Sequence, residues 1–279
     1  MVIVKKDLEE FIQRNRMQDC VVCLHSSLKS FGKVAGGAQS VIDAFLESGC
    51  TLVCPSFFYE SAAFPQKNYR QNGIDFESIA NNTSGMTFPC INYEEQPGQI
   101  DKSMGIIPKT LLTLPTARRT KNAMNSFCVA GPKAEELVNG KTPNIVDSVY
   151  TAYTVYKNIF SCEKEKSYIL LAGVDFTSCT PIHFAEEVSG KKQFRRWALY
   201  KSKITETEVG SCSDGFEALR PYLQDLEATD TVGNAKMRIY PFKEFIVKAA
   251  QVIKENPSLT MCSSNCGRCA DMSRGGFFE

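Results

Sequence analysis

The chain of 279 residues is 43% hydrophobic and 23% charged, enough apolar material for one large domain or two intimately packed lobes. Its 32 basic and 31 acidic residues leave a formal net charge of +1, so bulk charge gives no case for nucleic acid or an anionic membrane as a partner. Residues 1–10 carry charges where a secretory signal needs an apolar run, and no apolar stretch reaches membrane-spanning length, so we expect a cytoplasmic protein.

The N-terminal part predicts a strand, loop, helix, strand unit. A helical pattern over residues 7–17 precedes a buried strand over 20–25. After a polar loop, apolar residues at helical spacing predict a helix over 38–48, and 51–55 reads as a second strand. Such a connection normally makes the two strands parallel neighbours and places the loop at the ligand-binding end of the sheet.

The remaining elements complete an α/β pattern. Residues 59–102 lose periodicity and are rich in Asn, Gln, Gly and Pro, so we interpret them as a functional insertion that shapes a binding site. Helices are predicted over 107–114, 133–139, 148–160, 214–226 and 242–254, and strands over 168–174, 193–200 and 236–240. The expected fold class is α/β: a single compact domain with a central, mostly parallel or mixed sheet flanked by helices.

The loop after the first buried strand has the composition of a binding loop. Three serines and the pair Gly36-Gly37 leave backbone amides free at a helix start, and Lys29 and Lys33 are available for phosphates. The loop lacks the spacing of a P-loop and of G-x-G-x-x-G, so it is no nucleotide fingerprint. An ordinary surface loop with a glycine pair at the helix start is the alternative.

Only two histidines occur, and His183 lies just past the strand over 168–174, where open α/β sheets present catalytic groups. It is therefore the best candidate for a general base. Glu186 and Glu187 follow at three and four residues, so a helix starting near Pro181 places a carboxylate on the histidine's face. A histidine that only packs or caps the helix is the alternative.

Cys179 offers a second chemistry in the same segment. It lies four residues before His183, and a thiol near a histidine can become a thiolate that forms an acyl-enzyme. The protein would then be a ping-pong acyltransferase or a thioesterase.

The C-terminal segment holds Cys262, Cys266 and Cys269 within eight residues. Such spacing can chelate zinc or hold part of an iron–sulfur cluster, with Cys212 or an exogenous ligand as the fourth group. A flexible tail with redox-sensitive thiols is the alternative, and we expect no metal. Most of the twelve cysteines lie in apolar runs, where free Cys behaves as a small hydrophobe, so we expect reduced thiols.

Short sequence blocks follow one another along most of the chain. They are 21–28, 36–38, 49–55, 103–108, Arg119 with Ser126-Phe127 and Gly131-Pro132, 171–174, Thr180-x-x-His183-x-x-Glu186, and 232–235 with Arg238. In content and order these blocks resemble the aminoglycoside 3-N-acetyltransferase family of antibiotic-resistance enzymes, over residues 21–254. The resemblance implies that family's own α/β fold, not the histone-acetyltransferase-like one, with residues 1–258 as the acetyltransferase domain and 259–279 as a Cys-rich tail.

The resemblance also implies an activity. Acetyl-coenzyme A would donate its acetyl group directly to an amino group of a small molecule, an aminoglycoside at its 3-N position or a related amine. His183 is matched to the general base and Glu186 to the residue that orients it. The residues implied to bind coenzyme A are His25, Ser26, Ser27, Leu28, Lys29, Gly36, Gly37, Met104, Ser126 and Phe127. The residues implied to bind the acceptor are Asp175, Thr180 and Glu187.

Two departures from the family pattern concern the acceptor. Where the family commonly shows Arg-Ser-x-His-Pro, this chain has Asn122 and Ala123 in place of the histidine and proline. Six positions before His183, where an acidic residue is frequent in the family, it has Thr177, with Asp175 two residues earlier. Fewer acidic residues weaken binding of a polycation, so we infer a divergent member whose acceptor need not be an aminoglycoside.

Two further alternatives concern the activity and the assembly of the protein. The protein could be a non-catalytic sensor that binds coenzyme A or an amine, although a mere binder has no need of a base at the reaction centre. The sequence also leaves a homodimer open. The expected partners are an amine acceptor and coenzyme A, with no nucleic acid and no membrane.

Overall fold

The central element is a seven-stranded mixed sheet in the order β10-β11-β7-β2-β4-β6-β5. The computed structural model describes residues 2–68, 74–83, 86–140, 145–162, 166–263 and 265–278. The strands of the sheet are β2 Val21–Ser26, β4 Thr51–Pro55, β5 Arg118–Arg119, β6 Phe127–Ala130, β7 Ser167–Ala172, β10 Ala228–Val232 and β11 Ala235–Pro241. Only the middle pairs, β7 with β2 and β2 with β4, are parallel. The outer pairs are antiparallel, which makes the sheet mixed, as expected.

The predicted strand, loop, helix, strand unit is confirmed as β2, α2 (Gly37–Glu47) and β4, with Val21 opposite Thr51. Strand β2 is apolar from Val21 to Leu24 because successive side chains enter different cores: Val21 and Cys23 lie in one cluster, and Val22 and Leu24 in the other. A run without polar alternation is what a strand covered on both faces requires.

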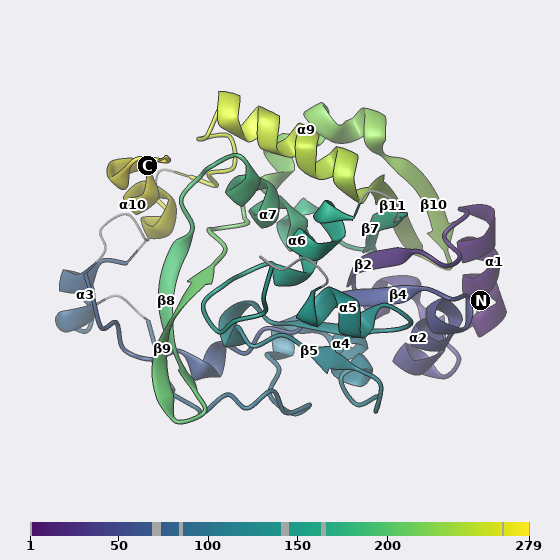
Figure 1. The fold of residues 1–279 in the computed structure, drawn as a ribbon. Helices are drawn as coiled ribbons and strands as arrows, with labels where there is room; N and C mark the ends of the chain where they lie inside the picture. The colour runs from purple at the N-terminus through teal and green to yellow at the C-terminus, as the bar shows by residue number, and fades with distance from the viewer. Residues whose placement is uncertain are drawn as a thin grey trace.

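Helices cover both faces of the sheet (Figure 1). The helices packed on one core are α5 Ala134–Asn139, α6 Thr154–Ser161, α7 Pro181–Val188, α8 Arg220–Leu223 and α9 Phe242–Glu255. Those packed on the other are α1 Lys5–Arg14, α2 and α4 Ile106–Leu111. Among the described residues, no helix is both long enough and apolar enough to span a lipid bilayer.

A two-stranded antiparallel ribbon, β8 Phe194–Tyr200 with β9 Lys203–Val209, stands beside the sheet, on the left of Figure 1. The described parts of the 59–102 insertion, which include α3 (Phe76–Ala80), pack against it through bridges from Ala62 to Ala198 and from Tyr93 to Tyr200. The C-terminal helix α10 (Gly267–Gly275) lies near the upper end of the ribbon. A short parallel pair, β1 Val2–Ile3 with β3 Lys33–Val34, completes the elements.

Several predicted boundaries differ from the structure. The helix predicted over 214–226 is broken into two 3₁₀ turns flanking α8, with Pro221 at its start, because proline cannot donate the backbone hydrogen bond of a helix interior. The helix predicted over 148–160 begins only at Thr154. Strands β5, β6, β9 and β10 had no prediction, since they are short or largely polar and carry little periodic signal.

Gly173 gives a test of how tightly the binding loop packs on the sheet. It follows β7 at φ +69°, and a Cβ there would lie 2.2 Å from Cβ of Ser30, whose hydroxyl donates to the Gly173 carbonyl at 3.0 Å. We expect Gly173→Ala to lower the free energy of unfolding by about 2–4 kcal/mol, through left-handed strain and overpacking.

Urea unfolding measures this effect, with Gly98→Ala as the matched control. Gly98 is exposed and a Cβ there meets no atom within 4 Å, so its change should stay within about 0.5 kcal/mol. Equal stabilities for the two variants would contradict this packing.

Candidate active site

A cavity of about 940 Å³ opens at the carboxyl ends of the three central strands. Its wall includes Ser27 after β2, Pro55 at the end of β4 and Val174 after β7. This is the end at which open α/β sheets present ligand-binding groups. The insertion contributes Tyr59, and the ribbon contributes Arg196.

His183 lies on this cavity because α7 begins at Pro181, immediately after the segment that leaves β7. Proline suits a helix start, where its missing N–H has no partner to lose. One turn into the helix, Nδ1 of His183 lies 3.0 Å from Oε2 of Glu186. The imidazole packs edge-on against Phe216 at 4.6 Å, and a Cβ on Gly210 would lie 2.6 Å from the ring. The side chain is therefore held from three sides.

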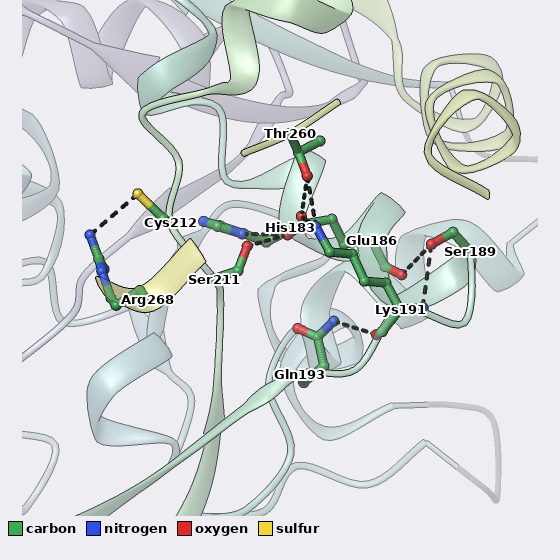
Figure 2. A network of polar contacts seen from close by, with 9 residues as sticks. All are labelled: His183, Glu186, Ser189, Lys191, Gln193, Ser211, Cys212, Thr260 and Arg268. Carbon is green, nitrogen blue, oxygen red and sulfur yellow. Dashed lines mark hydrogen bonds and ion pairs between the residues drawn. The ribbon is translucent and has the colours of Figure 1, made fainter. Parts of the chain in front are cut away.

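Glu186 is 1% exposed and is surrounded by donors (Figure 2). Lys191 Nζ donates to Oε1 at 2.6 Å, Thr260 Oγ1 to Oε1 at 2.9 Å, and Ser211 Oγ to Oε2 at 2.7 Å. Burial alone would raise the pKa of Glu186, but Lys191 and His183 outweigh it and lower the pKa to about 2.

The ionised carboxylate fixes the histidine tautomer. A carboxylate only accepts hydrogen bonds, so Nδ1 of His183 must carry the hydrogen in the 3.0 Å contact with Glu186. In the neutral ring this leaves Nε2 with a free lone pair, which is the arrangement a general base needs.

The structure brings together most of the residues implied to bind coenzyme A. His25, Ser26, Ser27, Leu28, Lys29 and Met104 all line the cavity. Gly36 and Gly37 lie outside its lining, at the start of α2, where left-handed backbone explains the glycines. Ser126 and Phe127 are buried: the Ser126 hydroxyl donates to the Ser56 carbonyl at 2.7 Å, and Phe127 belongs to the core.

Of the three residues implied to bind the acceptor, one lines the cavity and two do not. Thr180 lines the cavity. Asp175 caps a 3₁₀ turn by accepting from the backbone and hydroxyl of Thr177, and Glu187 pairs with Lys157 at 2.6 Å. Neither carboxylate belongs to the cavity lining.

Cys179 has the wrong surroundings for a nucleophile. It is 1% exposed, belongs to the apolar core and does not line the cavity. Burial raises the pKa of the thiol well above its usual range, so a thiolate is disfavoured. The geometry therefore argues against the acyl-enzyme alternative.

The two departures from the family pattern, Asn122 and Thr177, differ in their relation to the cavity. Asn122 is 1% exposed and structural: its Nδ2 donates to the Glu208 carbonyl at 2.8 Å and its Oδ1 accepts from the Asn125 backbone at 3.0 Å. Thr177 lines the cavity and contributes no charge to it.

Several residues of the site carried no sequence signal. Lys191, Ser211 and Thr260 hold Glu186 from three separate segments, so no local spacing connects them. Asn125 and Arg268 line the cavity, and Nδ2 of Asn125 is buried without a hydrogen-bond partner. A buried hydrogen-bond donor without a partner is available to a ligand.

The cavity is electrostatically one-sided. Among its described lining residues four are basic, Lys29, Lys102, Arg196 and Arg268, and none is acidic. Two carboxylates, Glu60 and Asp101, line a smaller neighbouring space of about 430 Å³. Asp101 is already engaged, since it accepts from the backbone and hydroxyl of Ser103.

Comparison with known proteins gives one family. The family model described as aminoglycoside 3-N-acetyltransferase matches residues 23–254. The chain is 24% identical over 259 residues to aminoglycoside N(3)-acetyltransferase III of a Salmonella species, covering 88% of this chain and 85% of that protein.

Solved structures show the same fold. The apoenzyme of the aminoglycoside acetyltransferase AAC(3)-IVa superimposes with a TM-score of 0.76 at 17% identity, covering 99% of each chain. The binary complex of AAC-IIIb with CoASH superimposes with a TM-score of 0.68 at 14% identity, covering 91% of this chain and 97% of that one. The expected fold class is confirmed.

His25 makes the cavity floor sensitive to acid. It is 5% exposed; burial lowers its pKa from 6.5 to about 3, against an opposing hydrogen bond with the Ser178 backbone. The unfolded chain therefore binds a proton that the native chain does not. The stability contributed by neutral His25 is complete above pH 6.5 and is lost as pH falls from there towards 3, by about 1.4 kcal/mol per pH unit.

Urea unfolding of the parent and of His25→Asn at pH 7 and pH 5 tests this. We expect the parent to lose about 2 kcal/mol more than the variant over that interval. Burial raises the pKa of Asp147 to about 6, so this carboxyl makes the native chain more stable as the pH falls. Both proteins carry Asp147, so its contribution cancels when their losses of stability are compared. Parallel losses in the two proteins would contradict a buried neutral His25.

Proposed function

Because this chain belongs to the aminoglycoside 3-N-acetyltransferase family, we propose that it transfers the acetyl group of acetyl-coenzyme A directly to an amino group of a small molecule, an aminoglycoside or a related amine. It is an acyltransferase by family membership. The co-substrate is supported by the neighbouring AAC-IIIb structure, which was solved with CoASH.

The observation that carries the proposal is the pairing of His183 with Glu186, at 3.0 Å, on the same cavity as the loop after β2. Coenzyme A would lie along Ser26, Ser27 and Leu28, with Lys29 and Lys102 available for its phosphates. The acetyl thioester and the amine would then meet at His183.

The chemistry follows from the amine. Its nitrogen forms a bond to the thioester carbon only as a proton leaves, and Nε2 of His183 takes that proton while Glu186 stabilises the imidazolium. The tetrahedral intermediate collapses by breaking the carbon–sulfur bond. The sulfur leaves as the thiol of coenzyme A, with the proton returned by His183.

The donor to the developing oxyanion is the amide side chain of Asn125. The backbone N–H of Ser27, in the loop after β2, donates to the Ala172 carbonyl at 3.0 Å and is therefore not available to an oxyanion. Asn125 lines the cavity with an unused Nδ2, and preorganised donors of this kind stabilise charge that develops in the transition state.

The charge of the cavity bears on the acceptor. A polycationic aminoglycoside gains from carboxylates, and the described lining offers none, whereas Arg196 and Arg268 add positive charge beyond the two lysines. We therefore favour an amine with fewer positive charges than an aminoglycoside, above all one that also carries an anionic group.

Two neighbouring glutamates provide a matched pair of variants. Glu186→Gln loses the anion that orients His183, and we expect kcat to fall about 10–100-fold with an unchanged Kd for coenzyme A, while His183→Ala should lower kcat about 10²–10⁴-fold. Glu187→Gln, whose carboxylate pairs with Lys157, should keep the parental kcat.

Release of free thiol from acetyl-coenzyme A in the presence of amines measures these rates. A His183→Ala protein as active as the parent would defeat the general-base assignment. A parent that binds coenzyme A and transfers to no amine would favour the sensor alternative.

A panel of acceptors tests the acceptor class. We expect a monoamine bearing a carboxylate or phosphate to give a higher kcat/KM than a polycationic aminoglycoside, by about tenfold, because opposite charges attract in a partly desolvated cavity. Arg268→Ala should reduce that preference. Aminoglycosides ranking first, with an unchanged order in Arg268→Ala, would overturn this preference and leave the acetyl-transfer reaction standing.

A further inference from the structure

Four cysteines from two distant parts of the chain meet beside the cavity. Cys262, Cys266 and Cys269 belong to the C-terminal segment, and Cys212 follows the ribbon strand β9. Their sulfur atoms all lie within 4.8 Å of one another. Cys212 and Cys269 are buried, and the other two are half-buried, so the cluster lies just below the surface.

The spacing of the sulfurs is that of one tetrahedral metal ion. Sγ of Cys262 lies 3.7 Å from Sγ of Cys212 and 3.7 Å from Sγ of Cys269, and Cys266 lies 3.9 Å from Cys212. Four thiolates at about 2.3 Å from a zinc ion stand about 3.8 Å apart, the edge of the tetrahedron. A cluster of several irons would hold its cysteines farther apart.

We propose that Cys212, Cys262, Cys266 and Cys269 bind a structural zinc ion that fastens the C-terminal segment to the wall of the cavity. Zinc sites of four cysteines are closed and tetrahedral, with ligands a few residues apart, as Cys262, Cys266 and Cys269 are. A zinc ion here differs from the expectation of a chain without metal, and it makes Cys262, Cys266 and Cys269 of the C-terminal segment part of the site.

The surroundings suit thiolate ligands. Nη2 of Arg268 donates to Sγ of Cys212 at 3.5 Å, which supplies positive charge to a centre that four thiolates would make negative (Figure 2). The Asp214 carboxylate lies 3.4 Å from the same sulfur, a contact that suits a thiol. Asp214 is exposed, so its side chain is able to turn into solvent when the thiol ionises.

The C-terminal segment from residue 259 onward buries little apolar surface against the rest of the protein. Among the described residues from 259 onward, only Cys269 and Met272 are buried hydrophobic side chains. Met272 packs with Phe194 and Val209 of the ribbon, a small apolar contact for a segment of this length. Segments that bury little apolar surface usually rely on disulfides or metals for order.

The zinc ion would join the segments that hold the base in place. Ser211, next to Cys212, and Thr260, two residues before Cys262, both donate to the Glu186 carboxylate (Figure 2). Arg268, between Cys266 and Cys269, reaches the cavity wall. The metal is therefore a positioning group for Glu186 and Arg268, a consequence that rests on the proposed function, whereas the metal site itself does not.

Metal analysis of the full chain tests the site. The protein is purified without a histidine tag under reducing conditions, and its metals are measured by mass spectrometry. We expect about one zinc ion per chain and almost none in a Cys212→Ser, Cys269→Ser double variant. The matched control, Cys90→Ser with Cys162→Ser, removes two thiols outside the cluster and should retain the zinc.

If the cluster variant fails to fold, two measurements on the parent protein still test the zinc site. Cobalt exchanged into the parent should give the absorption of tetrahedral thiolate coordination, and a chelator should lower the Tm. Zinc far below one per chain with no such cobalt spectrum overturns the proposal. So does iron in place of zinc, or a disulfide within the cluster in protein alkylated without reduction.

The positioning role has its own readout. Loss of zinc should lower kcat about tenfold or more, because Glu186 would lose the positioned donors Ser211 and Thr260. The Kd for coenzyme A should stay unchanged, because the loop after β2 is not part of the cysteine cluster. A zinc-free protein with parental kcat would overturn the positioning role. A parent that holds zinc and acetylates no amine would instead defeat the proposed function.

Discussion

The site depends on one buried carboxylate. Glu186 is almost completely removed from water, and an unpaired charge in that position would cost several kcal/mol. Its donors come from four places along the chain: His183 on the same helix, Lys191 just beyond it, Ser211 after the ribbon and Thr260 in the C-terminal segment. The carboxylate therefore selects the arrangement of these segments as much as it orients the histidine.

The sheet explains why this carboxylate lies where it does. Two parallel pairs in the middle of the sheet open one common end, and α7 starts there from the segment after β7. The loop after β2 reaches the same end, so most of the residues implied to bind coenzyme A share one cavity with His183. The ribbon and the insertion contribute to the other side of the cavity and supply two of its four basic side chains, Arg196 and Lys102.

The sequence predicted the parts of this arrangement that depend on local pattern. The β2, α2, β4 unit and the start of α7 follow from apolar runs, helical spacing and Pro181. It did not predict Lys191 or Thr260, because a side chain that crosses from a distant segment leaves no periodic trace. Ser126 and Phe127 fit the family's order of blocks, yet their side chains serve the core, which residue type alone does not reveal. Three cysteines of the tail suggested a metal site with Cys212 or an exogenous ligand as the fourth group, and the fold brings Cys212 next to the three.

The central claim, that buried Glu186 fixes the tautomer of His183, is tested most directly by ¹⁵N NMR of the imidazole nitrogens, with His25→Asn used to assign the two histidines. We expect neutral His183 to carry its hydrogen on Nδ1 with Nε2 unprotonated, and Glu186→Gln to lose this preference. A hydrogen on Nε2 in the parent protein would contradict it, because that nitrogen could then accept no proton from the amine.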